Sequence, residues 1–146
     1  MQFSLQVAGN QSFLSKGGSG RLGGWQLMYL NANSDVYFFG ENGAGAVVGS
    51  VISTANITLN TWTTTAIVTD RASYLDIYYD GLKTGVEAGN IYPPLATNID
   101  KSDEELFIGN SNTLGLPFTG SIKSIYLAKY AFTPTQINQI YTYLNQ

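Results

Sequence analysis

Apolar and polar residues alternate along much of this chain, in short runs separated by glycine- and asparagine-rich stretches. The alternation is clear in residues 3–7, 25–29, 35–39 and 75–79, and residues 12–16, 46–52, 62–69, 106–108 and 118–127 are also rich in strand-forming residues. Alternation with a period of two is typical of a strand with one buried face. Short strands at this spacing predict an all-β, two-sheet antiparallel β-sandwich.

A β-hairpin is predicted where the dipeptide Asp80-Gly81 separates two strand-like runs. Asp-Gly is a strong hairpin signal, because glycine reaches positive φ without steric strain. In the strand that precedes the turn, Leu75, Ile77 and Tyr79 share one face and are expected to point inward.

The same alternation predicts a hydrophobic core. In the segment 62–69, the inward face is expected to carry Trp62, Thr64, Ala66 and Val68. The residues expected to be buried are Trp62, Leu75, Ile77, Ile108, Phe118, Ile122, Ile125 and Leu127. Strict alternation puts Ile122 and Ile125 on opposite faces, so a β-bulge is predicted at Lys123-Ser124 to bring both inward.

The C-terminus predicts one short helix. Thr133 is a good N-cap, Pro134 suits the first helical position, and Gln136 stands at the capping-box position. Phe132 and Ile137 have the spacing of a hydrophobic staple. The apolar face of this helix consists of Ile137, Ile140, Tyr141 and Leu144. Such a face predicts a helix that packs against the sandwich.

The amino-acid composition argues against several classes of function. The 146 residues contain no Cys and no His, carry a net charge of −3, and fit a single domain over 1–146. Seven scattered basic residues argue against nucleic-acid binding. No apolar run has transmembrane length, and the residues after Met1 lack the pattern of a signal peptide, so we expect no membrane insertion. Charged residues make up only 12% of the chain, which favours extensive contact with partners.

Paired carboxylates of the kind used by glycosidases are not predicted. Asp76 and Asp80 share a strand face, but four residues of strand separate them by about 13 Å. Glycosidases place their two carboxyl groups about 5–9.5 Å apart. A serine nucleophile would lack a histidine base. We therefore expect no catalytic residues and no enzymatic activity.

Several motifs occur in an order that points to a known family. They are Trp62, Leu75-Asp76-Ile77-Tyr78-Tyr79-Asp80-Gly81, Leu106-Phe107-Ile108-Gly109-Asn110, Phe118-Thr119-Gly120-Ser121-Ile122, Phe132-Thr133-Pro134-Thr135-Gln136-Ile137, and Tyr141. This series resembles the laminin-G-like (concanavalin A-like) jelly-roll domain. The resemblance implies a jelly-roll sandwich that binds a partner. The family's usual leading strand is missing, which implies an open sheet edge and makes Phe3, Leu5 and Val7 candidates for subunit contacts.

The resemblance also raises the question of calcium. Asp100, Asp103, Glu104 and Glu105 form an acidic cluster that offers oxygen ligands, and they are the candidate metal residues. However, the family often carries Asp directly after its Gly-x-Ile motif, where this chain has Lys123, which cannot bind a metal. We therefore expect no cofactor, with calcium at the acidic cluster as the alternative.

Outward aromatic side chains offer a platform on which a sugar ring can stack. The candidate glycan-binding residues are Tyr37, Tyr74, Asp76 and Tyr78. Two functions are therefore predicted. The first is a non-catalytic structural protein, such as a phage capsid-decoration or tail component in the virion, which contacts other protein subunits in a homo-oligomer or shell. The alternative is a glycan-binding, lectin-like adhesion module, either extracellular by a non-classical route or part of a larger surface protein.

Overall fold

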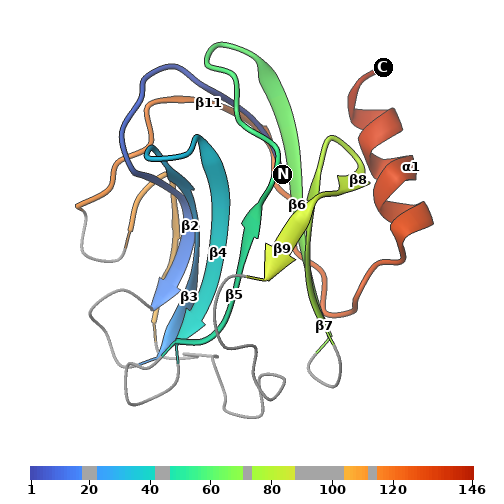
Figure 1. The fold of residues 1–146 in the computed structure, drawn as a ribbon, viewed down its shortest axis with the longest axis horizontal. Coiled ribbons are helices and arrows are strands. Elements are labelled where there is room, and N and C mark those ends of the chain that lie inside the picture. The colour runs from blue at the N-terminus through green and yellow to red at the C-terminus, as the bar shows by residue number, and fades with distance from the viewer. Residues whose placement is uncertain (18–22, 42–46, 71–73, 88–103, 112–114) are drawn as a thin grey trace.

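The computed structural model describes residues 1–17, 23–41, 47–70, 74–87, 104–111 and 115–146, which form two antiparallel sheets and a C-terminal helix (Figure 1). The five-stranded sheet contains, in spatial order, β11 (Gly120–Ser124), β1 (Gln2–Leu5), β6 (Trp62–Asp70), β7 (Tyr74–Tyr79) and β8 (Leu82–Lys83). The six-stranded sheet contains β10 (Leu106–Ile108), β2 (Gln11–Gly17), β3 (Gly24–Leu30), β4 (Asp35–Glu41), β5 (Val47–Ser53) and β9 (Gly85–Glu87). The predicted all-β sandwich with one short C-terminal helix is confirmed.

The hydrophobic core lies between the two sheets. Its buried members are Phe3, Leu5, Phe13, Leu14, Leu27, Tyr29, Val36, Phe38, Val51, Ile57, Leu75 and Ile77. Phe3 and Phe13 pack across the sandwich with their ring centroids 4.3 Å apart. The inward face predicted for β7 is confirmed, since Leu75 and Ile77 are buried and Tyr79 packs against the same cluster.

β1 is a central strand, so the predicted open edge at the N-terminus is wrong for residues 2–5. Gln2, Phe3 and Ser4 pair with β6 on one side, and Gln2–Leu5 pair with β11 on the other. Phe3 and Leu5 are fully buried in the core, and only Val7 of the three contact candidates is exposed. A subunit contact through Phe3 or Leu5 would require the sandwich to open.

The predicted phase of β6 is also wrong. Thr63, Thr65 and Ile67 face the core, because Thr65 and Ile67 pair with the core-facing Tyr79 and Ile77 of β7. The opposite face, which carries Ala66 and Val68, packs beneath the helix. Trp62 lies at the start of this second face and is 48% exposed. The strand is covered on both faces, and in such a strand apolar residues no longer mark the core side.

Two further core predictions fail near the sheet ends. Ile108 and Leu127 are exposed, while Phe118, Ile122 and Ile125 are partly buried against the core. Ile108 lies on the three-residue edge strand β10. Leu127 follows β11 in a segment that has left the sheet. The predicted bulge is confirmed, because the register shifts where Gln2 pairs with Ser124 and Phe3 with Ile122.

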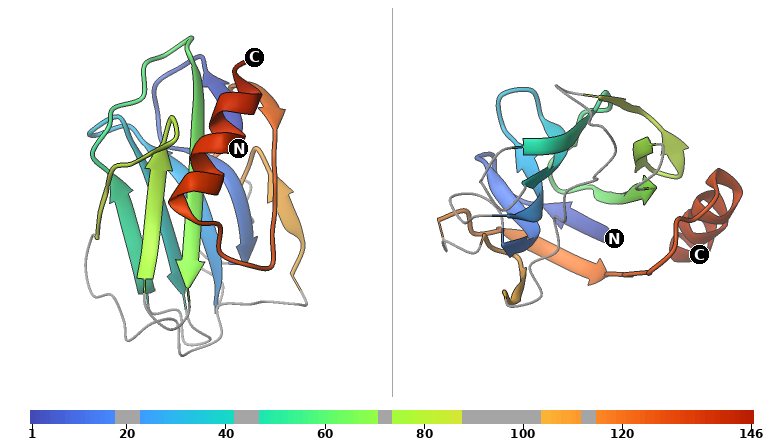
Figure 2. Two further views of the ribbon diagram at one scale, coloured as in Figure 1. Left: turned by 90° about the vertical axis from the view of Figure 1, so that its right-hand side faces the viewer. Right: turned by 90° about the horizontal axis from the view of Figure 1, so that it is seen from below.

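The helix α1 (Pro134–Leu144) forms as its capping residues predict. The Thr133 hydroxyl accepts a hydrogen bond from the Gln136 amide, and the Gln136 side chain accepts one from the Thr133 amide. Ile137 and Leu144 are buried. Figure 2 shows α1 on the outer side of the five-stranded sheet, where a second cluster joins Val68, Tyr78 and Ile137 to Ala66, Tyr74 and Phe132.

The β7–β8 hairpin turns at Asp80-Gly81, as predicted. Asp80 has φ of 48° and Gly81 has φ of 80°, the left-handed values that a tight hairpin turn uses. The Asp80 carboxylate accepts a hydrogen bond of 2.8 Å from the Thr64 amide, which ties the turn to β6. A Cβ on Gly81 would lie 2.9 Å from the ring of Tyr141, so the glycine also lets α1 approach the turn.

Candidate binding groove

A groove of about 370 Å³ runs beside β6 and opens into the interior of the sandwich. One wall is β6 from Thr64 to Thr69, and the other is the segment from Tyr126 to Phe132 that connects β11 to α1. The floor consists of core side chains from the opposite sheet, namely Leu14, Trp25, Leu27 and Phe38. In the left view of Figure 2, the N-terminus lies at the upper end of the space between β6 and the connecting segment.

The groove lies where β6 continues past its last backbone pair with Met1. Met1 and Thr65 form the last backbone pair between β1 and β6, with Thr65 N–H donating to Met1 O at 2.9 Å. Beyond that pair, β6 extends from Ala66 to Asp70 with a strand partner only on its β7 side, among the residues that the structure describes. Residues 125–128 on the opposite wall follow β11 but belong to no strand.

Among the described residues, β6 beyond Thr65 has no strand partner on the side that faces the groove. In an antiparallel sheet, the N–H and C=O groups of alternate residues point to opposite neighbours. Thr65 bonds toward Met1, whereas the Thr64 carbonyl accepts from Asp80 on the β7 side. The same alternation directs the backbone groups of Ile67 and Thr69 into the groove. Buried backbone groups normally find partners, which makes this edge a place for a ligand to bind.

The connecting segment adds exposed apolar surface to the groove. Tyr126, Leu127 and Tyr130 line it and are 56%, 63% and 67% exposed, respectively. Tyr130 also packs edge-on against Phe132, with ring centroids 5.0 Å apart. Large apolar side chains that gather at a surface are typical of a contact with a partner. We call Tyr126, Leu127 and Tyr130 the apolar wall.

The charged groups of the groove are cationic. The Met1 ammonium donates a hydrogen bond of 2.7 Å to the Thr65 carbonyl, and burial lowers its pKa to about 6. Lys129 is the other basic residue among the described lining residues, which include no Asp or Glu. At pH 7 the Met1 amine is therefore largely uncharged, and it acts at this end of the groove as a hydrogen-bonding group.

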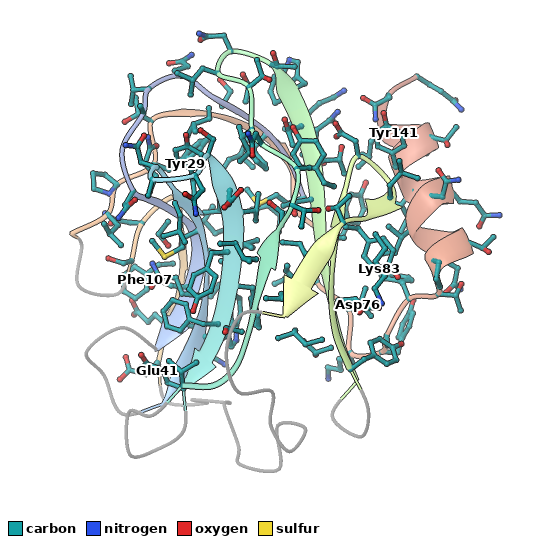
Figure 3. The ribbon with its side chains drawn as sticks, in the orientation of Figure 1. Tyr29, Glu41, Asp76, Lys83, Phe107 and Tyr141 are labelled. Atoms are coloured by element: carbon teal, nitrogen blue, oxygen red, sulfur yellow. The ribbon has the colours of Figure 1, made fainter. Side chains whose placement is uncertain are left out.

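The three candidate glycan residues on β7 lie under α1. Tyr78 is buried and Tyr74 packs against the same helix cluster. Burial raises the pKa of the Tyr78 hydroxyl, with a further rise from the neighbouring Asp76 carboxylate. Asp76 forms an ion pair with Lys83 at 2.6 Å, and Figure 3 shows both residues beside the helix. These residues do not offer an open stacking platform.

The fourth glycan candidate, Tyr37, lies on the outer face of the six-stranded sheet. Its ring stacks on that of Phe39, with centroids 5.5 Å apart and an interplanar angle of 27°. Gln26 pairs with Phe39 in the adjacent strand, and its buried side-chain amide nitrogen has no hydrogen-bond partner. Burial raises the pKa of Glu41 at the end of the same strand. On this face Tyr37 is half-buried, whereas Gln26, Phe39 and Glu41 are buried.

The acidic cluster falls mostly outside the described residues. Asp100 and Asp103 lie outside them, whereas Glu104 is half-buried and Glu105 is exposed. In the described part of the chain, no group of three or more carboxylates, histidines or cysteines converges on one point. The expectation of no metal, with calcium at this cluster as the alternative, stays a prediction.

Sequence reasoning missed the groove itself. Ile125 and Leu127 have the alternation of a strand, and the sequence predicts that both face inward. Nothing in the local pattern says that Met1 pairs with Thr65, because that pairing depends on the register between distant segments. The available signal was the density of Tyr and Leu residues between β11 and the helix cap.

Comparison with known proteins gave two findings. Residues 4–138 match a family described as the concanavalin A-like lectin/glucanases superfamily. The chain is also similar to the crystal structure of an S-layer domain-containing protein (residues 221–444) from Clostridium thermocellum, at 16% identity and a TM-score of 0.45. That match covers 94% of this chain and 65% of the other, so this chain spans less than two thirds of that structure. A search of curated proteins found no match. Among the described residues, no helix has the length and apolar character needed to cross a membrane.

Proposed function

The chain belongs to the concanavalin A-like lectin/glucanases superfamily, and we propose that it is a non-catalytic module that packs against other protein subunits. The observation that carries this proposal is the apolar wall, Tyr126, Leu127 and Tyr130, beside a groove that reaches the core. Interface cores are enriched in tyrosine and depleted in charge, and this surface has that composition.

The lack of suitable catalytic groups supports a non-catalytic role. The sequence contains no His or Cys. Asp76 is held by Lys83, and the Asp80 carboxylate accepts a hydrogen bond from the Thr64 amide, so both serve the fold. A glycosidase needs two carboxyl groups that face one substrate, and these two carboxylates are each engaged with the protein.

We propose that this module is part of a virion, as a capsid-decoration or tail component. The low share of charged residues supports that setting, since subunits of a shell contact neighbours on several faces. Weak contacts suffice there, because many repeated contacts on a particle give high avidity.

Sedimentation of the purified chain over a wide concentration range tests subunit packing. The wild type is expected to associate, and Leu127→Asp is expected to weaken association about tenfold or more, because it places a charge in an apolar contact. Leu82→Asp is the matched control, since Leu82 is 68% exposed on β8 outside the groove lining. A wild-type chain that stays monomeric at millimolar concentration would contradict the proposal.

Glycan binding on the outer face of the six-stranded sheet is the second candidate function. It is supported by the half-buried Tyr37, whose ring stacks on that of the buried Phe39 and is the aromatic surface that a sugar would reach on this face. Screening the wild type and Tyr37→Ala against a glycan array tests it. Binding that Tyr37→Ala removes would support this function, and an array without any bound glycan would contradict it.

A further inference from the structure

We propose that two buried water molecules bind between α1 and the five-stranded sheet, where they bridge the side chains of Gln2, Thr64 and Ser124. These three residues lie on the outer face of the sheet, beneath the last turn of the helix. The site goes beyond the proposed function, since it concerns how the helix is held on the sandwich and needs no partner subunit. We call Gln2, Thr64 and Ser124 the polar row.

The polar row follows from the register of three neighbouring strands. Gln2 of β1 pairs with Ser124 of β11 on one side and with Thr64 of β6 on the other. Paired residues in an antiparallel sheet point to the same face, with their Cβ atoms about 4.5–5.5 Å apart. Phe3, the next residue of β1, is buried in the core between the sheets. Gln2 and its two partners therefore point outward, toward α1.

Each side chain of the polar row has a buried oxygen without a hydrogen-bond partner. The three atoms are Gln2 Oε1, Thr64 Oγ1 and Ser124 Oγ. Gln2 and Thr64 are only 2% and 7% exposed, so bulk solvent does not reach their oxygens. A buried polar group that lacks a partner destabilises a fold, and native proteins satisfy nearly all such groups. Three of them in one row indicate a bound polar molecule.

Hydrogen bonds from the helix fix the orientation of the Gln2 amide. Asn145 Nδ2 donates to the Tyr141 carbonyl at 2.8 Å, which leaves Asn145 Oδ1 to accept from Gln2 Nε2 at 3.3 Å. Gln2 Oε1 therefore points away from Asn145 and needs a donor. The Lys123 ammonium donates to the Leu144 carbonyl at 3.3 Å, and no bond joins it to Gln2 Oε1. The two hydroxyls of the polar row do not reach Gln2 Oε1 directly.

Water has the hydrogen-bonding groups that the polar row requires. An amide carbonyl oxygen has two lone pairs, so Gln2 Oε1 can accept from one water on each side. One water then bonds to Thr64 Oγ1 on the β6 side, and the other bonds to Ser124 Oγ on the β11 side. Two to four polar partners are what a buried water needs. A metal cation is disfavoured, since it would exchange its hydration for neutral oxygens close to the Lys123 ammonium.

The sign of a stability change separates a hydrated row from a dry one. Thr64→Val and Ser124→Ala each remove one hydroxyl, and Ser121→Ala is the control on an exposed position of β11. With bridging waters, Thr64→Val and Ser124→Ala are each expected to raise the equilibrium constant of unfolding about threefold or more relative to the control, because a hydrogen bond is lost. In a dry row, removal of an unpartnered hydroxyl stabilises the fold instead. An unchanged or lowered constant in either variant would overturn the proposal.

A high-resolution crystal structure of the wild-type chain locates the waters directly. The expected result is two ordered waters within about 3.2 Å of Gln2 Oε1, one bonded also to Thr64 Oγ1 and the other to Ser124 Oγ. In crystals of Thr64→Val, the first water is expected to be lost and the second to stay, because they lie on opposite sides of Gln2. Fewer than two waters at Gln2 Oε1 in the wild type, or a metal ion in their place, would overturn the proposal.

Discussion

The α-amino group of Met1 is buried at the end of the groove, and this burial makes stability depend on pH. Its pKa is about 6 in the folded domain, against an ordinary value of 8.0. Between these values the unfolded chain binds more protons than the folded one, so stability rises as pH rises from 6 to 8. The penalty is fully present below pH 6, absent above pH 8, and amounts to about 3 kcal/mol.

Denaturant unfolding at pH 5.5 and pH 8.5 measures this effect. The control is the same chain with an acetylated N-terminus, which has no titrating amine there. The chain has no histidine, so few other groups titrate in this window. An unmodified chain whose stability changes with pH no more than that of the acetylated chain would show that the amine is not buried.

Two aromatic residues of neighbouring strands should respond very differently to truncation. Phe3 is fully buried against Phe13, so Phe3→Ala is expected to lower the free energy of unfolding by about 3–5 kcal/mol. Trp62 is 48% exposed at the start of β6, so Trp62→Ala is expected to lower it by less than about 1 kcal/mol. Comparable losses in thermal or denaturant unfolding would place Trp62 in the core after all.

The contrast between Phe3 and Trp62 shows that alternation alone does not always predict which side chains are buried. β7 followed the predicted phase, because Leu75 and Ile77 face the core between the sheets, although Tyr78 on its other face is buried beneath α1. β6 did not, because Ala66 and Val68 lie on the face beneath α1 and threonines lie on the core face. Thr63 and Thr65 are buried on the core side of β6. Neither the alternation nor the hydrophobicity of the sequence predicts their burial.

At the scale of elements, α1 docks on the β7–β8 turn through a glycine. Gly81→Ala would force a side chain into positive φ and place a Cβ 2.9 Å from the Tyr141 ring. Gly9→Ala is the matched control, since Gly9 also has positive φ but no atom within 4 Å of an added Cβ. We expect Gly81→Ala to lower stability by about 1–3 kcal/mol more than Gly9→Ala, through the clash alone. Equal losses in thermal unfolding would show that α1 does not approach the turn.

Elements with local signals were predictable from the sequence, and elements defined by register were not. The helix follows from Thr133, Pro134 and Gln136, and the hairpin follows from Asp80-Gly81, because each signal acts within a few residues. The three-residue strand β9 has no such signal and forms because it pairs with β5. The segment 125–128 has the composition of a strand but lacks a partner at its position.

At the scale of the whole molecule, the groove combines segments from both ends and the middle of the chain. Met1, residues 64–69 and residues 126–132 meet there, and none of these stretches is unusual by itself. The sandwich could be predicted, since alternation and turns repeat along the chain. The site could not, because it depends on how these distant segments lie beside one another.

The central claim is that the apolar wall beside β6 is a contact surface for protein subunits. The most direct test is the thiol reactivity of Leu127→Cys, in a chain that has no other cysteine, measured at low and high protein concentration. The account predicts that Leu127→Cys reacts freely in the monomer and becomes at least tenfold less reactive on association, while Leu82→Cys is unchanged. A Leu127→Cys thiol that stays as reactive in the associated state as in the monomer would contradict the account.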